Sequence, residues 1–240
     1  MRRIAYDEID STNSEAQRRI ADGDITGWTL ITGAIQTAGR GRLGRSWASP
    51  TGNFYGSFII PKDQRSEWQR PWLLGAVAAL AVADTAAAFV EDGSAIRLKW
   101  PNDVLVGGAK TAGLLLEGSG TNPFVVLGIG LNIAFAPQGA PYPVTALDRH
   151  RSTPAGLPAV TDALAALIAS RVEGWLDGGF AALRARYLTR SHRPGEALSV
   201  QHGEQRIAGR FLDVDADGFL IMEVDGRERR FSTGDVFPTG

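Results

Sequence analysis

Apolar and β-branched residues along this chain gather into short runs separated by turn-forming residues, a pattern typical of strands in a packed sheet. The runs at residues 28–36, 53–61 and 124–133 each predict one strand. Residues 96–118, IRLKW followed by VLVGGAKTAGLLLEG, predict strands around a Gly-Gly hairpin turn. The N-terminal part of the chain is therefore expected to build a sheet.

Longer segments with helical composition lie between and after these runs. Residues 72–92 are rich in helix formers and end before Gly93. Residues 161–178, with Thr161 as a cap, predict an amphipathic helix, and 180–190 predict another. Near the N-terminus, Ser11 or Thr12 could cap a helix that stops at Gly23, with Glu15 placed as a capping-box partner. A loop rich in proline and glycine is expected at 136–160.

The pattern of apolar and polar residues changes after Arg193-Pro194-Gly195. From there on, short strands alternate with turns such as HGEQ, DADG and DGRE, a pattern that predicts a small all-β unit and favours a little barrel. The layout is thus a large α+β domain at residues 1–190, in which helices flank a mixed sheet, followed by a β domain at 191–240.

Composition excludes several classes of protein. The formal net charge of −1 gives no global attraction to nucleic acid or to an anionic membrane. The chain has no cysteine, so disulfides, thiolate metal sites and cysteine nucleophiles are excluded. No apolar signal core follows the N-terminal residues, and no run is long enough for a membrane span. A cytoplasmic protein is the simplest expectation.

One segment, QTAGRGRLGRSW at 36–47, carries the pattern Gly39-x-Gly41-x-x-Gly44 of a dinucleotide-binding turn. That reading needs a helix opened by the glycines, and Pro50 and Gly52 stop helix growth too early. Arginines beside a tryptophan could instead hold a nucleic acid, but three arginines in a neutral protein make a small footprint. A flexible loop that carries guanidinium groups to phosphate oxygens explains the segment better.

Three further stretches accompany this loop: IDSTNSEA at 9–16, RLKWPNDVLVGGAKTAGLLLEG at 97–118, and GIGLNI at 128–133. Together, the four stretches resemble the biotin protein ligases in order and approximate spacing. The GRGRxGRxW and KWPND…KxAG strings are the specific part, and the likeness covers essentially the whole chain. It implies a catalytic domain with a mixed sheet and a small C-terminal SH3-like β-barrel.

The resemblance also implies a two-step reaction. Biotin and ATP, with Mg²⁺ carried on the phosphates, give biotinyl-5′-adenylate. A lysine of a biotin carboxyl carrier domain then accepts the biotin. Because the STN motif begins at Ser11, the chain looks like the form that lacks an N-terminal DNA-binding domain, so no DNA or membrane partner is expected. An edge strand could pair with its counterpart to make a homodimer.

The first step brings two anions together, and their repulsion is roughly 4 kcal/mol at about 4 Å and an effective dielectric near 20. Arg40, Arg42, Lys99 and Lys110 are the candidate cations that offset it. By resemblance, Arg42 covers the acyl phosphate and Lys110 reaches the biotin carboxylate. Asp103 could orient or deprotonate the incoming amine, although a turn-forming role in Pro-Asn-Asp is equally plausible.

The ureido ring of biotin needs neutral donors and acceptors in an apolar pocket. The positions that the resemblance assigns to biotin are Ser11, Thr12, Asn13, Gln36, Gly39, Arg40, Gly41, Lys110, Gly113, Leu115 and Gly128. Those assigned to ATP and the adenylate are Arg40, Arg42, Trp47, Lys99, Lys110 and Asn132. No metal-ligand cluster is visible, and the scattered His150, His192 and His202 are expected at the surface.

The sequence leaves two rival functions open. A lipoate or octanoate ligase or transferase shares the expected fold, but the KWPND string and the glycine–arginine loop favour biotin. A catalytically silent biotin-binding module is the rival from another class, and the retained Arg42, Lys99 and Lys110 argue against it.

Overall fold

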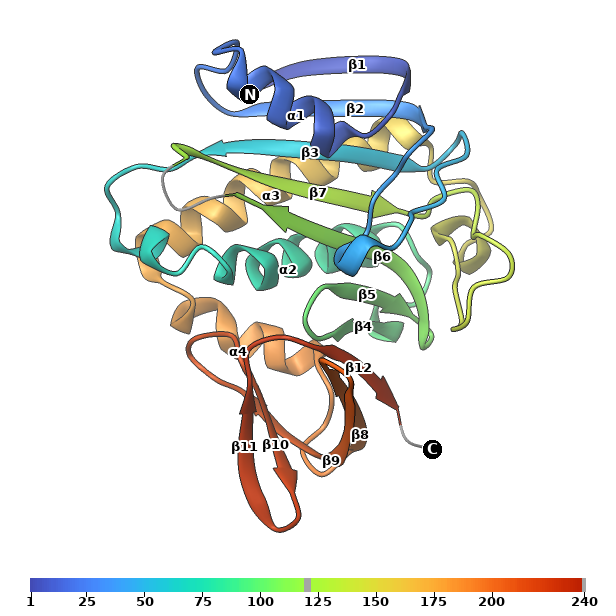
Figure 1. Cartoon of the computed structure of the whole chain (residues 1–240). Helices are drawn as coiled ribbons and strands as arrows, with labels where there is room; N and C mark the ends of the chain where they lie inside the picture. The colour runs from blue at the N-terminus through green and yellow to red at the C-terminus, as the bar shows by residue number, and fades with distance from the viewer. Residues whose placement is uncertain (119–121, 239–240) are drawn as a thin grey trace.

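A computed structural model describes residues 1–118 and 122–238 of the chain. Its centre is a seven-stranded mixed sheet with the strand order β1-β2-β3-β7-β6-β5-β4 (Figure 1). The strands are β1 (Arg2–Ile9), β2 (Thr29–Gln36), β3 (Phe54–Pro61), β4 (Ile96–Lys99), β5 (Asp103–Val106), β6 (Ala109–Glu117) and β7 (Phe124–Leu131). Only β1 and β2 pair in parallel, and the other neighbours are antiparallel.

Helices cover both faces of this sheet. They are α1 (Thr12–Ala21), α2 (Leu73–Ala88), α3 (Leu157–Gly178) and α4 (Ala181–Arg190). α2 lies between the sheet and the pair α3 and α4, so most of its side chains are apolar and buried. α1 packs on the opposite face, against β2, β3 and β7, which leaves the rest of that face free for a site (Figure 1).

A second, antiparallel sheet follows α4. Its strands are β8 (Ala197–His202), β9 (Gln205–Val214), β10 (Leu220–Val224), β11 (Arg227–Phe231) and β12 (Asp235–Pro238), in the order β11-β10-β9-β8-β12. The predicted all-β unit is therefore present, but the barrel is not: no pairing closes β11 onto β12 within the described residues. The sheet lies below α4 and the β4–β5 end of the large sheet (Figure 1).

The N-terminal strand and its neighbour helix correct the sequence analysis in two places. β1 was not predicted, because most of its side chains are exposed and its sequence RRIAYDEI is mainly polar. Ser11 does cap α1 and accepts from the amide of Ser14. Glu15 is not a capping-box partner, since it accepts from the Tyr6 hydroxyl at 2.6 Å and pairs with arginines of its own helix.

The long loop expected at 136–160 is shorter than predicted. α3 already begins at Leu157, with Gly156 as its N-cap residue and a proline in its first turn, so Thr161 is inside the helix and not its cap. A 3₁₀ turn at Leu147–His150 interrupts the rest of the segment. None of the described helices combines the length and apolar character needed to cross a membrane.

Candidate active site

A pocket opens on the free face of the large sheet, between the start of α1, the loop 37–47 and strands β6 and β7. Twelve of the residues predicted for the site line it: Ser11, Thr12, Asn13, Gln36, Arg40, Gly41, Arg42, Trp47, Lys110, Gly113, Leu115 and Gly128. These residues come from four segments of the sequence, and the fold brings them to one place. Arg45, Ser46, Asn102 and Tyr142, which the sequence analysis did not name, line it too.

One end of the pocket is a buried network of neutral polar side chains. The Thr12 amide and hydroxyl both donate to Gln36 Oε1, at 2.9 and 3.2 Å. The Ser57 hydroxyl lies 2.8 Å from Thr12 Oγ1 and 2.5 Å from Asn13 Oδ1. Asn13 Nδ2 donates to Glu117 at 2.9 Å. Because each side chain is held by another, this end presents fixed donors and acceptors to a neutral polar ligand.

Glycines on β6 and β7 form the floor of the pocket. Gly113 pairs with Gly130, and Leu115 pairs with Gly128. A methyl group at Gly130 would lie 2.5 Å from the indole Nε1 of Trp47, and one at Gly113 would lie 2.9 Å from its Cζ3. The missing side chains let the Trp47 ring rest directly on the sheet backbone. Its buried Nε1 has no hydrogen-bond partner among the described residues.

The glycine–arginine loop folds back on itself instead of opening a helix. Trp47 donates to the Gly39 carbonyl at 2.9 Å, Gly41 donates to the Arg45 carbonyl at 2.6 Å, and Arg40 bridges to Ser46. Its only helical piece is the 3₁₀ turn Arg42–Gly44. Gly39 is needed inside the loop, because a side chain there would meet the Trp47 carbonyl and Ser49. This geometry differs from a dinucleotide-binding turn, which requires an α-helix N-terminus.

The loop arginines are anchored on both sides of the pocket. Arg40 pairs with Glu117 of β6 at 2.9 Å. Arg42 donates to Asn102 Oδ1 at 2.9 Å and to the Gly234 carbonyl at 3.3 Å, and Asp235 of the second sheet lies 3.5 Å away. Burial lowers the pKa of Arg42, and the charge of Asp235 opposes that shift. The C-terminal sheet therefore contributes to the wall around the loop.

Two lysines converge on one buried carboxylate beside the pocket. Asp103 is 7% exposed; Lys110 Nζ lies 2.7 Å from its Oδ1 and Lys99 Nζ 3.0 Å from its Oδ2. Lys99 also donates to the Val236 carbonyl at 3.2 Å. Lys110 Nζ lies over the Trp47 and Tyr142 rings, 5.3 and 5.5 Å from their centroids. Lys110 reaches the pocket directly, whereas Lys99 is linked to it through Asp103.

Asn132 lies in an adjoining cavity that shares Trp47, Lys110, Ser46 and Tyr142 with the first one. Its Nδ2 donates to the Thr145 carbonyl at 3.0 Å, and its Oδ1 accepts from Asn53 at 3.4 Å. Both ends of its amide thus already have partners. The His150 ring, 2.8 Å from Thr145 Oγ1, supports this arrangement, so His150 is not simply a surface residue. His192 is also mainly buried, with its side chain 10% exposed.

Asn53 is a residue that the sequence analysis missed. It is 1% exposed, and its Oδ1 accepts from three successive amides, those of Ile133, Ala134 and Phe135, at 2.9–3.0 Å. Its Nδ2 donates to the Phe135 carbonyl at 2.8 Å. One side chain therefore fixes the turn after β7 that carries Asn132.

Asn53→Ala is expected to lower the free energy of unfolding by about 2–3 kcal/mol, because three buried amides lose their acceptor together. Chemical denaturation of both proteins measures the difference. Asn122→Ala is the matched control, since among the described residues Asn122 Oδ1 accepts from a single amide, that of Phe124. A loss at Asn53 no larger than that at Asn122 would show that water replaces the asparagine at little cost.

Comparison with known proteins places the chain in a family. Residues 6–133 match the model of the biotin/lipoate A/B protein ligase family. The biotin–[acetyl-CoA-carboxylase] ligase of Paracoccus denitrificans is 36% identical, over 95% of this chain and 97% of its own. The enzyme of the same name from Mycobacterium tuberculosis is also 36% identical, over 94% and 85%.

The fold gives a concordant match. A biotin protein ligase from Aquifex aeolicus, solved in complex with biotin and ATP, superimposes with a TM-score of 0.83 at 24% identity, over 99% of both chains. The family model covers more than half of the chain, and the relatives cover nearly all of it. This chain belongs to the biotin/lipoate A/B protein ligase family and, within it, to the biotin protein ligases.

Proposed function

We propose that this protein uses ATP to convert biotin to biotinyl-5′-adenylate and transfers the biotin to a lysine of a biotin carboxyl carrier domain, as the names of its relatives indicate. The observation that carries the proposal is one pocket with neutral donors and acceptors at one end and cations at the other. Biotin has the same polarity, with a neutral ureido ring at one end and a carboxylate at the other.

The neutral end suits the ureido ring. Ser11, Thr12, Asn13 and Gln36 hold its polar atoms in this proposal, with Leu115 beside the rings. Gly128 lies on β7 directly under Asn13, so the Asn13 amide that faces the ureido ring can pack closely against the sheet. No charged group is needed at this end, and Glu117 acts from behind by fixing the Asn13 amide.

The cationic end suits the reacting anions. A carboxylate oxygen of biotin attacks the α-phosphorus of ATP, and the bond to pyrophosphate breaks. Lys110 and Arg42 neutralise the charge that builds up on the phosphate oxygens, with Arg40 and Lys99 beside them. The adjoining cavity that contains Trp47 and Asn132 is the place for the adenine base.

Mg²⁺ would enter with ATP, held by phosphate oxygens and water. No group of three or more acidic or histidine side chains that could hold a metal occurs in the described ranges. The cation would thus offset phosphate charge, and the side chains of this chain would position the nucleotide.

The second half-reaction gives Asp103 its proposed role. The carboxylate lies beside Asn102 at the pocket wall and could take a proton from the incoming amine once Lys110 has turned toward the adenylate. Asp103→Asn should slow transfer to the carrier about 100-fold, at the lower edge of what a proton-transfer group contributes, and slow adenylate formation less. Single-turnover assays of each half-reaction measure the ratio. Equal losses would mean that Asp103 only holds the two lysines.

The C-terminal unit, residues 191–240, takes part through its last turn. Gly234 and Val236 offer carbonyl groups to Arg42 and Lys99, and Asp235 pairs with Arg45 at 2.9 Å. In this proposal the second domain holds the cations of the first in place before ATP arrives.

One assay tests the whole proposal. Purified protein is incubated with biotin, MgATP and a carrier domain, and intact mass reports the addition of one biotin at a lysine. ATP–pyrophosphate exchange is run in parallel with biotin and with lipoate. Exchange with lipoate alone would assign the protein to the other branch of its family, and exchange with neither acid would leave a binding module.

A further inference from the structure

The strand that carries Lys110 changes its neighbour close to that residue. β7 accompanies β6 only as far as Ala112. Beside Lys110 its place is taken by the segment 143–145, which runs parallel to β6. The Lys110 amide donates to the first carbonyl of this segment, and the Lys110 carbonyl accepts from the amide of its last residue, Thr145, both at 2.9 Å. Both backbone groups of Lys110 are therefore bound to the segment 143–145.

Thr145 joins Lys110 to Asn132. Its carbonyl accepts from Asn132 Nδ2 at 3.0 Å, while its amide is bound to Lys110. Thr145 is 5% exposed and lines neither the pocket beside α1 nor the adjoining cavity that contains Asn132. The lysine proposed to neutralise the phosphate and the asparagine proposed to face adenine are thus fixed by the two backbone groups of one buried residue.

The side chain of Thr145 is held by a histidine. Its hydroxyl and the Nε2 of His150 share a hydrogen bond of 2.8 Å. His150 ends the 3₁₀ turn that closely follows Thr145, and its carbonyl accepts from the Glu91 amide at 3.0 Å. The ring lies beside Gly107, where an added Cβ would be 3.9 Å from its Cε1. His150 is therefore fixed between the residues that follow α2 and the hairpin turn that precedes β6.

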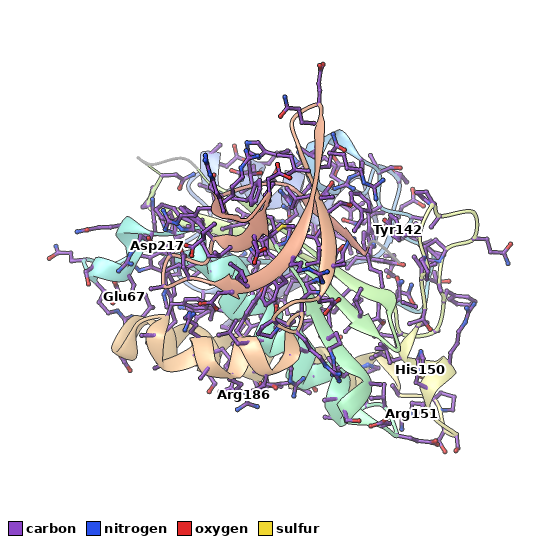
Figure 2. All side chains as sticks on the ribbon, turned by 90° about the horizontal axis from the view of Figure 1, so that it is seen from below. Glu67, Tyr142, His150, Arg151, Arg186 and Asp217 are labelled. Atoms are coloured by element: carbon purple, nitrogen blue, oxygen red, sulfur yellow. The ribbon has the colours of Figure 1, made fainter. Side chains whose placement is uncertain are left out.

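His150 lies near the proposed nucleotide site without lining it. Figure 2 shows His150 on the same side of the molecule as Tyr142, which lines the cavity that contains Asn132. The histidine itself lines a separate surface cleft, together with Glu91 and Arg149. A nucleotide in the proposed site would therefore not touch the imidazole, and an effect of His150 on the reaction would pass through the hydrogen bond to Thr145.

We infer that His150 is a positioning residue for ATP, an inference that rests on the proposed function. By holding the Thr145 hydroxyl, the ring fixes the Thr145 backbone, which orients the Asn132 amide and Lys110. The buried polar network proposed for the ureido ring lies on α1, β2 and β3 and is separate from these bonds. Loss of the histidine should therefore weaken the binding of the nucleotide and spare the binding of biotin.

His150→Ala provides the test. We expect KM for ATP in biotin-dependent pyrophosphate exchange to rise about fivefold, which corresponds to the loss of one hydrogen bond. The dissociation constant for biotin, measured by titration calorimetry without ATP, should stay within about twofold of wild type, as expected for independent sites. His150→Gln can keep a polar group near the position of Nε2 and should restore most of the loss. A histidine with only a structural role would lower stability without separating the two ligands.

Thr145→Val tests the other side of the same hydrogen bond. The backbone groups that bind Lys110 and Asn132 remain in this variant, and the hydroxyl alone is lost. KM for ATP should again rise about fivefold. The double variant should cost no more than either single one, because the two side chains act through one bond. Thr145→Val carries the test if His150→Ala does not fold.

His192→Ala is the matched control. His192 is also mainly buried and bonds to a side chain, with its Nδ1 2.8 Å from Glu196 Oε1, but it lies in the C-terminal unit. This variant should leave KM for ATP unchanged even where it lowers the melting temperature. An unchanged KM for ATP in folded His150→Ala, or an equal weakening of ATP and biotin binding, would overturn the inference. Absence of exchange in the wild-type protein would overturn the proposed function as well.

Discussion

Lys110→Gln is expected to slow biotin-dependent ATP–pyrophosphate exchange by about 10²- to 10³-fold, the usual loss when one preorganised donor to a developing charge is removed. Lys110 is the lysine that lines both the pocket between α1, loop 37–47 and strands β6 and β7, and the adjoining cavity that contains Asn132. Asp103 at 2.7 Å and the flanking Trp47 and Tyr142 rings hold its ammonium group there. Glutamine nearly keeps the size and the hydrogen bonding but removes the charge.

Exchange measured at saturating biotin separates this effect from weaker biotin binding. Lys62→Gln makes the same chemical change at a lysine outside both cavities and should leave the rate unchanged. Loss of less than about threefold at Lys110 would mean that Arg42 and the metal on ATP carry the charge without it.

Much of the fold could be predicted because its pattern is local. The strands at 28–36, 53–61 and 124–133 are buried on both faces, so they appear in the sequence as continuous apolar runs. α2 is mostly buried and rich in alanine and leucine, which indicates a helix whatever surrounds it. For such segments, burial and intrinsic preference favour the same structure.

Other elements depend on contacts that no local pattern contains. β1 is an edge strand with mostly exposed side chains, and only its pairing with β2 makes it a strand. At the start of α3, Leu157, the sequence predicts a loop because Gly156 and Pro158 usually mark turns, although proline is well tolerated in the first turn of a helix.

The same contrast between local patterns and long-range contacts holds for the site. Its principal side chains lie in four recognisable motifs, so their types and spacing could be predicted. The groups that hold them could not, because they lie far away in sequence: Glu117 is 77 residues from Arg40, and Thr233 is 191 residues from Arg42. Asn53 lies near the loop motif, but only the structure shows that it binds the turn after β7. Asn102, inside the KWPND string, could have been named from the motif itself.

Gly128→Ala should raise the dissociation constant for biotin about 100-fold, the upper end of the roughly 1–3 kcal/mol that overpacking costs. The added methyl would lie 2.9 Å from Asn13 Cγ, 3.0 Å from its Nδ2 and nearer still to its Oδ1. Asn13 cannot turn aside cheaply, because Ser57 and Glu117 hold the two ends of its amide. The clash therefore falls on the group proposed to read the ureido ring.

Titration calorimetry with biotin measures this effect without any catalysis. Gly27→Ala adds the same methyl group where nothing lies within 4 Å, and it should bind biotin as wild type does. Wild-type affinity in Gly128→Ala would mean that Asn13 moves freely and reads no ligand. The double variant Gly128→Ala with Asn13→Ser separates the two effects, since the smaller serine removes the clash. If the clash with Asn13 is the cause, the two substitutions together should cost less affinity than the sum of each alone, because residues in contact are coupled.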